Sequence, residues 1–224
     1  MARSKKAVVL LSGGLDSATV LYWALDRGWR PRAQIFDYGQ RHGREIASAK
    51  ALCKKTGVAY DVIPVKLPWR GSSLLDKASA LPSAKNAGEI GSKIPSTYVP
   101  GRNTLFLSYG LSCAEAIGAE AVMIGANALD YSGYPDCRPD FISAMSKVFK
   151  LGTKAGRKGN SIKIVAPLLR FSKSQIIKLG IRLGVPYQMT WSCYRGGKKP
   201  CGTCDSCLLR AKGFKEAGKL DPTT

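Results

Sequence analysis

The chain has 224 residues, 45% of them hydrophobic, which is enough for one packed domain, or for a domain with a small appended segment. Lys and Arg number 35 against 15 Asp and Glu, so the formal net charge is +20. This charge favours anionic partners such as nucleotides or nucleic acid, or reflects a generally basic proteome. No apolar run reaches the ~18 residues of a membrane span, and residues 7–11 are too few for a signal-peptide core. We therefore expect a cytoplasmic protein with no membrane partner.

Five short, almost continuously apolar runs predict strands that are covered on both faces, as in a parallel sheet. They are residues 6–11, 32–36, 59–65, 120–125 and 161–165.

Apolar residues at helical spacing predict helices between these strands, over residues 17–27, 44–56, 104–117 and 173–183. Asn103 is the expected N-cap of the third helix, and Ser172 with Gln175 forms a capping box for the fourth. The alternation predicts an α/β fold with a doubly wound, parallel, five-stranded sheet.

Two stretches interrupt the alternation. Residues 66–100 contain prolines, glycines and serines without periodicity, which predicts an irregular loop or lid. The cysteines gather near the end of the chain. We therefore predict a main domain over residues 1–190, with a four-cysteine, zinc-binding segment over 191–224 packed on it.

The stretch "LLSGGLDSA" follows the first expected strand and precedes the first expected helix. Its two glycines allow close backbone approach, and a helix N-terminus offers N–H groups to phosphate. The Lys-Ser/Thr pair of a Walker loop is missing. Ser12, Gly13, Gly14, Asp16 and Ser17 instead resemble the SGGxDS signature of the PP-loop ATP pyrophosphatases. The resemblance implies an adenine nucleotide α-hydrolase-like fold that splits ATP between its α and β phosphates. The expected ATP-binding residues of the loop are Leu11, Ser12, Gly13, Gly14, Leu15, Asp16, Ser17 and Ala18.

Asp16 has two expected roles in this loop. It can cap the helix, or approach the phosphates through Mg²⁺ bound to ATP. Positive charge must then come from elsewhere. Arg102 and Lys173 precede expected helices at the same sheet edge, so we nominate both, with Asp16, as catalytic. Asp37 follows the second strand, where it faces the nucleotide or the activated group, or only shapes a turn. Arg102 is a further expected ATP ligand.

Four cysteines have the spacing C-x7-C-x2-C-x2-C: Cys193, Cys201, Cys204 and Cys207. Four thiolates around one ion predict a closed, structural zinc site with one Zn²⁺ per chain. An iron–sulfur cluster is the alternative, because it also takes four thiolates.

The remaining cysteines and the single histidine predict no further metal centre. Cys53 and Cys113 fall on apolar helical faces and are expected in the core, whereas Cys137 lies in a polar loop. His42 is expected to be a loop residue near the pocket and not a proton shuttle.

Four longer segments of the sequence resemble one particular family of PP-loop enzymes. "FDYGQRHGREIASA", "PSTYVPGRNTLFLS", "GANALDYSGYPDCRPDFI" and "WSCYRGGKKPCGTCDSCLLRAKGF", together with the glycine loop, resemble the 7-cyano-7-deazaguanine synthases, nitrile-forming ligases of queuosine biosynthesis. The resemblance runs from the first strand to Phe214, and all four cysteines match the zinc ligands of that family.

The resemblance implies that ATP adenylates the carboxylate of 7-carboxy-7-deazaguanine and that ammonia then displaces AMP to give an amide. It also implies that a second adenylation, followed by loss of AMP, gives the nitrile, 7-cyano-7-deazaguanine. It implies a homodimer and no obligatory nucleic acid. "ALDYSGYPDCR" is the expected substrate wall. In it Asp130 or Asp136 accepts hydrogen bonds from the base or holds Mg²⁺, Tyr131 or Tyr134 stacks on the ring, and Arg138 pairs with the carboxylate.

Two other functions fit parts of the sequence. A PP-loop tRNA thiolase or lysidine-type ligase would suit the basic charge, but no separate RNA-binding domain is apparent. A non-catalytic nucleotide sensor would bind ATP without producing AMP and pyrophosphate. The intact Asp16 and the "GRN" segment argue against a sensor.

Overall fold

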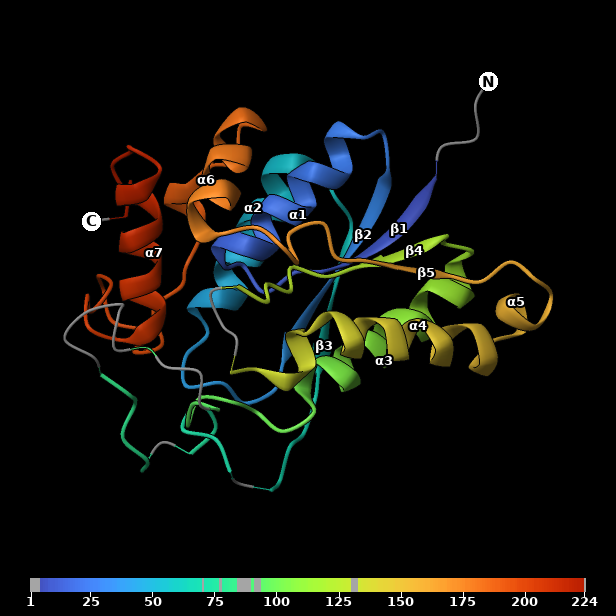
Figure 1. The fold of residues 1–224 in the computed structure, drawn as a ribbon, viewed down its shortest axis with the longest axis horizontal. Coiled ribbons are helices and arrows are strands. Elements are labelled where there is room, and N and C mark those ends of the chain that lie inside the picture. Colours follow the sequence, from blue (N-terminus) through green and yellow to red (C-terminus); the bar gives the residue numbers. More distant parts are fainter. Residues whose placement is uncertain are drawn as a thin grey trace.

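The computed structural model describes residues 5–69, 71–76, 78–83, 90, 94–129 and 133–223. Its centre is a five-stranded, fully parallel sheet (Figure 1). The strands are β1 (Lys6–Leu10), β2 (Arg30–Asp37), β3 (Tyr60–Pro64), β4 (Ala121–Met123) and β5 (Lys163–Val165).

The strand order is β3-β2-β1-β4-β5, so the chain builds outward from β1 in both directions. The order therefore reverses between β1 and β4. In open α/β sheets, ligands bind in the crevice at the carboxyl ends of the strands at such a point. The glycine loop directly after β1 lies at this position.

Helices cover both faces of the sheet (Figure 1). α1 (Leu15–Asp26), α2 (Arg44–Thr56), α6 (Lys173–Arg182) and α7 (Asp205–Glu216) lie on one side, and α3 (Arg102–Ile117), α4 (Pro139–Gly152) and the short α5 (Lys154–Arg157) on the other. Two short 3₁₀ turns, η2 (Pro135–Cys137) and η3 (Tyr187–Met189), complete the described elements.

Each face of the sheet has its own core. Successive side chains of a strand point to opposite faces, so Ala7 and Val9 join one cluster and Val8 and Leu10 join the other. All four are at most 6% exposed. This two-sided burial explains why the strand is apolar after its first residue, Lys6, which is exposed. Phe214 of α7 lies in the first cluster, so the helix after the cysteines shares the core of the sheet.

The five predicted strands and the four predicted helices are confirmed, with boundaries that shift by up to two residues. Helices α4, α5 and α7 were not predicted. α4 begins directly after the stretch that was assigned to a substrate wall, and α7 begins directly after Cys204.

Two of the three expected helix caps differ in the structure. The capping box of Ser172 and Gln175 is present. Asn103, however, lies inside α3, and its backbone N–H donates to Asp136 Oδ2 at 3.0 Å. Asp136 thus stabilises the start of α3 from a distant turn. Asp16 lies in the first turn of α1 and accepts no capping hydrogen bond.

The described part of the predicted lid, residues 66–100, has no helix or strand, as expected. Arg41 holds part of it, because its guanidinium donates to the carbonyls of Ser73 at 2.6 Å, of Asp76 at 2.8 Å and of Ser79. Leu74 is thereby buried beside the sheet edge. Within the described ranges, no helix is long and apolar enough to cross a bilayer.

Candidate active site

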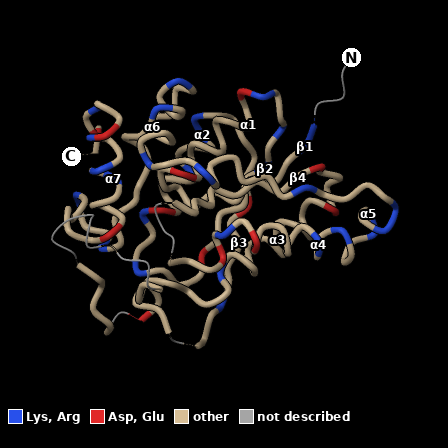
Figure 2. The backbone as a smooth tube through the Cα atoms, viewed as in Figure 1, with Lys and Arg blue, Asp and Glu red and all other residues tan. Residues whose placement is uncertain are grey.

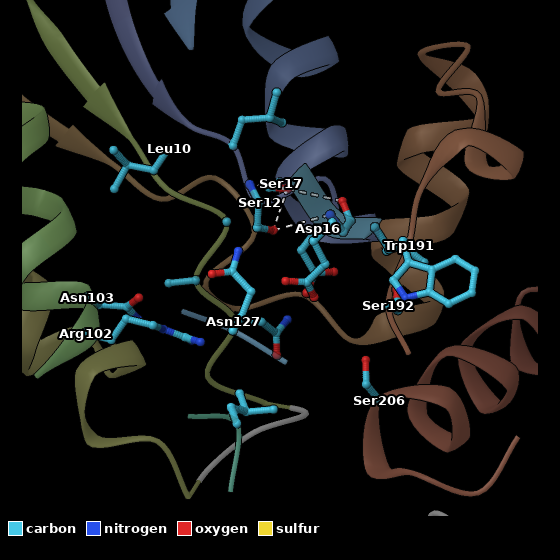
Figure 3. A pocket seen from close by; sticks show the side chains of 18 of the residues that line it. Leu10, Ser12, Asp16, Ser17, Arg102, Asn103, Asn127, Trp191, Ser192 and Ser206 are labelled. Atoms are coloured by element: carbon cyan, nitrogen blue, oxygen red, sulfur yellow. Dashed lines mark hydrogen bonds between the residues drawn. The ribbon is translucent and has the colours of Figure 1, made fainter. Parts of the chain in front are cut away.

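The loop between β1 and α1 presents backbone and hydroxyl groups to a pocket. Ser12 Oγ and Ser17 Oγ lie 3.0 Å apart, the Gly14 N–H donates to Ser12 Oγ at 3.3 Å, and Ser17 Oγ donates to the Gly14 carbonyl (Figure 3). Because α1 begins at Leu15, its N-terminal N–H groups and positive dipole end face the same space. The arrangement suits an anion such as phosphate.

Two neighbouring segments fix this loop. Gly13 has φ +85°, and a Cβ there would lie 2.2 Å from the carbonyl oxygen of Glu45 in the first turn of α2. On another side, the Trp191 N–H donates to the Gly13 carbonyl at 3.0 Å. Only glycine allows this approach, so Gly13 is required for packing as well as for the turn.

The pocket gathers side chains from both halves of the sheet and from the cysteine segment. Arg102 and Asn103 approach the loop from one side, and Trp191 and Ser192 from the other (Figure 3). The polar and ionisable side chains that line it are Ser12, Asp16, Ser17, Tyr38, Gln40, Arg41, His42, Glu45, Arg102, Asn103, Asn127, Tyr134, Cys137, Lys173, Trp191, Ser192, Tyr194, Ser206 and Arg210.

Lys173 and Asp16 form an ion pair in this pocket. Lys173 Nζ lies 2.9 Å from Asp16 Oδ1 and 2.8 Å from Oδ2, and the two side chains are 10% and 27% exposed. The pair joins the first turn of α6 to the first turn of α1, on the same sheet edge. Both residues were predicted from the sequence as catalytic, and they lie in contact in the structure.

Arg102 lies opposite this pair. Its guanidinium donates to Tyr38 Oη at 3.4 Å and lies 5.9 Å from the centre of the Tyr38 ring. Burial opposes the charge of Arg102, but the neighbouring Tyr38, Tyr134 and Asp136 raise its pKa above the ordinary value. Arg102 is therefore a permanent cation facing the pocket.

Glu45 is the second carboxyl group among the described residues that line the pocket, and it was not predicted as a site residue. Burial raises its pKa from 4.5 to about 7, against the lowering effect of Arg102, while Cys193 adds a smaller increase. Its carboxyl group makes no hydrogen bond or ion pair with any residue that the structure describes. Its role depends on how α2 packs on the glycine loop, which no local pattern indicates.

Several predicted site residues do not reach the pocket. Asp37 is exposed, and Tyr38 faces the pocket in its place. Ala18 is buried in the core. Asp136 is 5% exposed and bonds to α3, and Arg138 is the N-cap of α4; neither is among the lining residues.

Of the other residues in the predicted substrate wall, one lines the pocket and two are not described by the structure. Tyr134 lines the pocket, and its hydroxyl is 2.7 Å from Thr97 Oγ1. Asp130 and Tyr131 lie outside the described residues.

The four clustered cysteines converge as predicted. The Sγ atoms of Cys193, Cys201, Cys204 and Cys207 all lie within 4.8 Å of one another, close to the about 3.8 Å that four thiolates adopt around one zinc ion. The backbone N–H groups of Arg195 and Cys201 donate to Cys193 Sγ, which favours the thiolate form of the ligand. The cluster can therefore hold a metal ion such as zinc.

The metal-ligating segment also forms a wall of the pocket. Trp191 packs with the cysteines, and Trp191, Ser192 and Tyr194 line the pocket. Arg44 lies 4.6 Å from the centre of the Trp191 ring, which ties α2 to the same wall. A metal ion at the cysteines would therefore shape the pocket from outside it.

Comparison with known proteins gives the family of this chain. The family described as "Queuosine biosynthesis protein QueC" matches residues 6–218. The chain belongs to the QueC family. A relative from Nostoc punctiforme named 7-cyano-7-deazaguanine synthase is 56% identical over 97% of this chain and 98% of its own length. A relative of the same name from Thermoplasma acidophilum is 54% identical over 97% of this chain and 91% of its own length.

Among solved structures, the NMN synthetase from Francisella tularensis resembles this QueC-family chain with a TM-score of 0.51 at 17% identity, covering 98% of this chain and 79% of its own. At that identity the likeness shows the fold alone. It agrees with the PP-loop type of sheet predicted from the glycine loop, and the family membership confirms the resemblance stated from the sequence.

Proposed function

We propose that the protein is an ATP-dependent carbon–nitrogen ligase that converts 7-carboxy-7-deazaguanine and ammonia to 7-cyano-7-deazaguanine, with release of AMP and pyrophosphate. The supporting observation is one pocket that combines a phosphate-binding loop with the Asp16–Lys173 pair and Arg102. The name shared by the relatives at 54–56% identity supports the product.

The proposed reaction begins with adenylation of the substrate carboxylate. The carboxylate oxygen attacks the α phosphorus, and the bond to pyrophosphate breaks. Ser12, Ser17 and the first N–H groups of α1 hold the departing β and γ phosphates. Lys173 and Arg102 neutralise charge that develops there, which is the main way in which such a site accelerates the step.

Two further steps complete the reaction. Ammonia attacks the acyl adenylate and AMP leaves, giving the amide. The amide oxygen is then adenylated by a second ATP with loss of one N–H proton, and departure of AMP with loss of the other N–H proton gives the nitrile. Neither step requires a covalent bond to the protein, so positioning and charge are the main contributions of these residues.

Mg²⁺ would enter with ATP. Asp16 is the loop carboxylate that faces the phosphate space, and a carboxylate with phosphate oxygens is a usual Mg²⁺ environment. The ion would screen the phosphates from the carboxylate. The four cysteines would hold one Zn²⁺ per chain with no open coordination position, which is a structural role.

The substrate contacts remain proposals. Tyr134, which lines the pocket, is a candidate for stacking on the deazaguanine ring. Asp130 and Tyr131 remain candidates from the sequence, as do Asp136 and Arg138. A homodimer in the cytoplasm, without obligatory nucleic acid, also remains a prediction, which light scattering during gel filtration of the purified protein checks.

The test of the proposed function is incubation with 7-carboxy-7-deazaguanine, Mg-ATP and ammonium, followed by mass spectrometry. The nitrile should appear with two AMP for each nitrile. Omission of ammonium should abolish the nitrile. A protein that forms no amide or nitrile under these conditions would contradict the proposal.

A further inference from the structure

The proposed reaction makes a specific demand on the pocket, and this inference rests on that proposed function. An ammonium ion must lose one proton to become a nucleophile, a second when the amide forms, a third in adenylation of the amide oxygen, and a fourth when AMP leaves. All four protons come from the same nitrogen. A base beside that nitrogen would serve each step.

Among the lining residues that the structure describes, two carry carboxyl groups, Asp16 and Glu45. Asp16 is engaged by Lys173 through both of its oxygens, at 2.9 and 2.8 Å. Protonation of Asp16 would break this ion pair. Glu45 makes no hydrogen bond or ion pair within the described part of the chain, so its oxygens remain available to a ligand.

The other ionisable groups of the pocket are unsuited to accept a proton. Burial raises the pKa of Cys137 to about 11 and also raises the pKa values of Tyr38 and Tyr134, so these groups are protonated at neutral pH. The Nδ1 atom of His42 is buried, and the ring packs closely on Gly196 of the cysteine segment.

The position of Glu45 is fixed by the same contact that fixes the phosphate loop. Its backbone carbonyl occupies the space that a Cβ on Gly13 would need, so the first turn of α2 rests directly on the loop. The charged and titratable groups that act on its carboxyl are Arg102 of α3, Tyr38 after β2 and Cys193 of the cysteine segment. Burial outweighs the attraction of Arg102, which leaves the proton affinity of Glu45 matched to neutral pH.

We propose that Glu45 is the general base that takes protons from the nitrogen, first as ammonium enters, next as the attacking ammonia becomes the amide, and then as the amide loses its two N–H protons. In the first step the ammonium N–H bond breaks, its electron pair stays on nitrogen, and the proton moves to a Glu45 oxygen. The released ammonia then attacks the acyl carbon while AMP leaves. Between steps the proton passes to solvent.

The test compares Glu45→Gln with the wild-type enzyme at each stage. Glutamine keeps the size of the side chain but cannot accept the proton. Exchange of labelled pyrophosphate into ATP, which reports adenylation, should change less than about threefold, whereas kcat for amide formation from ammonium and for nitrile formation from the amide should each fall about 100-fold. The rise of wild-type kcat with pH should be lost in the variant. Glu120→Gln, at an exposed position before β4, is the matched control and should behave as wild type.

A second nucleophile shows whether the variant has lost proton removal or has instead lost its fold or its metal. Hydroxylamine is neutral at pH 7 and needs no deprotonation before attack, so Glu45→Gln should form the hydroxamate at a rate within about tenfold of wild type. Equal loss with ammonium and hydroxylamine, loss of pyrophosphate exchange, or unchanged kcat with ammonium would each overturn the proposal. Absence of any amide or nitrile from the wild-type enzyme would instead contradict the proposed function.

Discussion

The two carboxylate oxygens of Asp16 lie 2.9 and 2.8 Å from the ammonium nitrogen of Lys173, although 156 residues separate the two positions in the chain. This pair explains how a phosphate-binding loop can contain an acid. Lys173 neutralises Asp16 before any ligand arrives, so the loop presents its N–H groups and hydroxyls to phosphate without a net negative charge beside them.

Removing this lysine should affect both folding and catalysis. In Lys173→Met the Asp16 carboxylate stays partly buried without its cation, so the free energy of unfolding should fall by about 1–3 kcal/mol. Loss of positive charge at the phosphates should reduce kcat for pyrophosphate release about 100- to 1,000-fold. Urea unfolding and a pyrophosphate assay measure the two effects. Lys178→Met, an exposed change on the same helix, is the control, and equal effects of the two substitutions would contradict the assignment.

Gly13 should tolerate no side chain. In Gly13→Ala the added Cβ would meet the Glu45 carbonyl at 2.2 Å and the Ala49 nitrogen at 2.7 Å, and φ is +85°. The strain and the displaced helix should together cost about 2–4 kcal/mol, with a large increase in KM for ATP. Gly28→Ala has a similar positive φ but open space around its Cβ, so it should cost only about 1 kcal/mol. Thermal melting of both variants checks this contrast, which a similar loss in each would refute.

The cysteine cluster should bind zinc, and its loss should disturb the pocket. Metal analysis should find one zinc per chain in a colourless protein, and Cys204→Ser should lose the metal. Because Trp191 packs with the cysteines and contacts the glycine loop, the variant should melt at a lower temperature and bind ATP more weakly. Cys113→Ser, outside the cluster, should retain its zinc. Iron and sulfide in a brown protein would instead support an iron–sulfur cluster.

Glu45 should make stability depend on pH in a defined direction. Its folded-state pKa is raised to about 7 from 4.5, so between these values the folded protein holds a proton that the unfolded chain has lost. This contribution therefore lowers stability as pH rises from about 4.5 to about 7. Glu45→Gln should remove that loss and be more stable than wild type by about 1–3 kcal/mol at pH 8, with no difference at pH 4. Urea unfolding at the two pH values measures it; a variant less stable at pH 8 would show that burial does not dominate.

Local patterns in the sequence were sufficient for the sheet, the glycine loop and the cysteine site. β1 is apolar from Ala7 to Leu10 because both faces are covered there, and the cysteine spacing alone indicates a single ion. Long-range packing explains what was missed. Asp136 was expected at the substrate, but it bonds to the start of α3, 33 positions earlier in the chain.

The hydrophobic pattern of α4 begins directly after the charged and aromatic residues of the predicted substrate wall, and no helix was predicted there. Glu45 was missed for another reason, since nothing in "GREIASA" indicates that the first turn of α2 rests on Gly13. Its environment is produced only when distant segments meet around the pocket.

The central claim is that the pocket directs a substrate carboxylate oxygen to the α phosphorus of ATP. The most direct measurement uses 7-carboxy-7-deazaguanine labelled with ¹⁸O in its carboxylate, with ammonium and Mg-ATP, and mass spectrometry of the nucleotide and phosphate products. The account predicts ¹⁸O in AMP and none in inorganic phosphate or pyrophosphate. Formation of ADP with ¹⁸O in orthophosphate would contradict it.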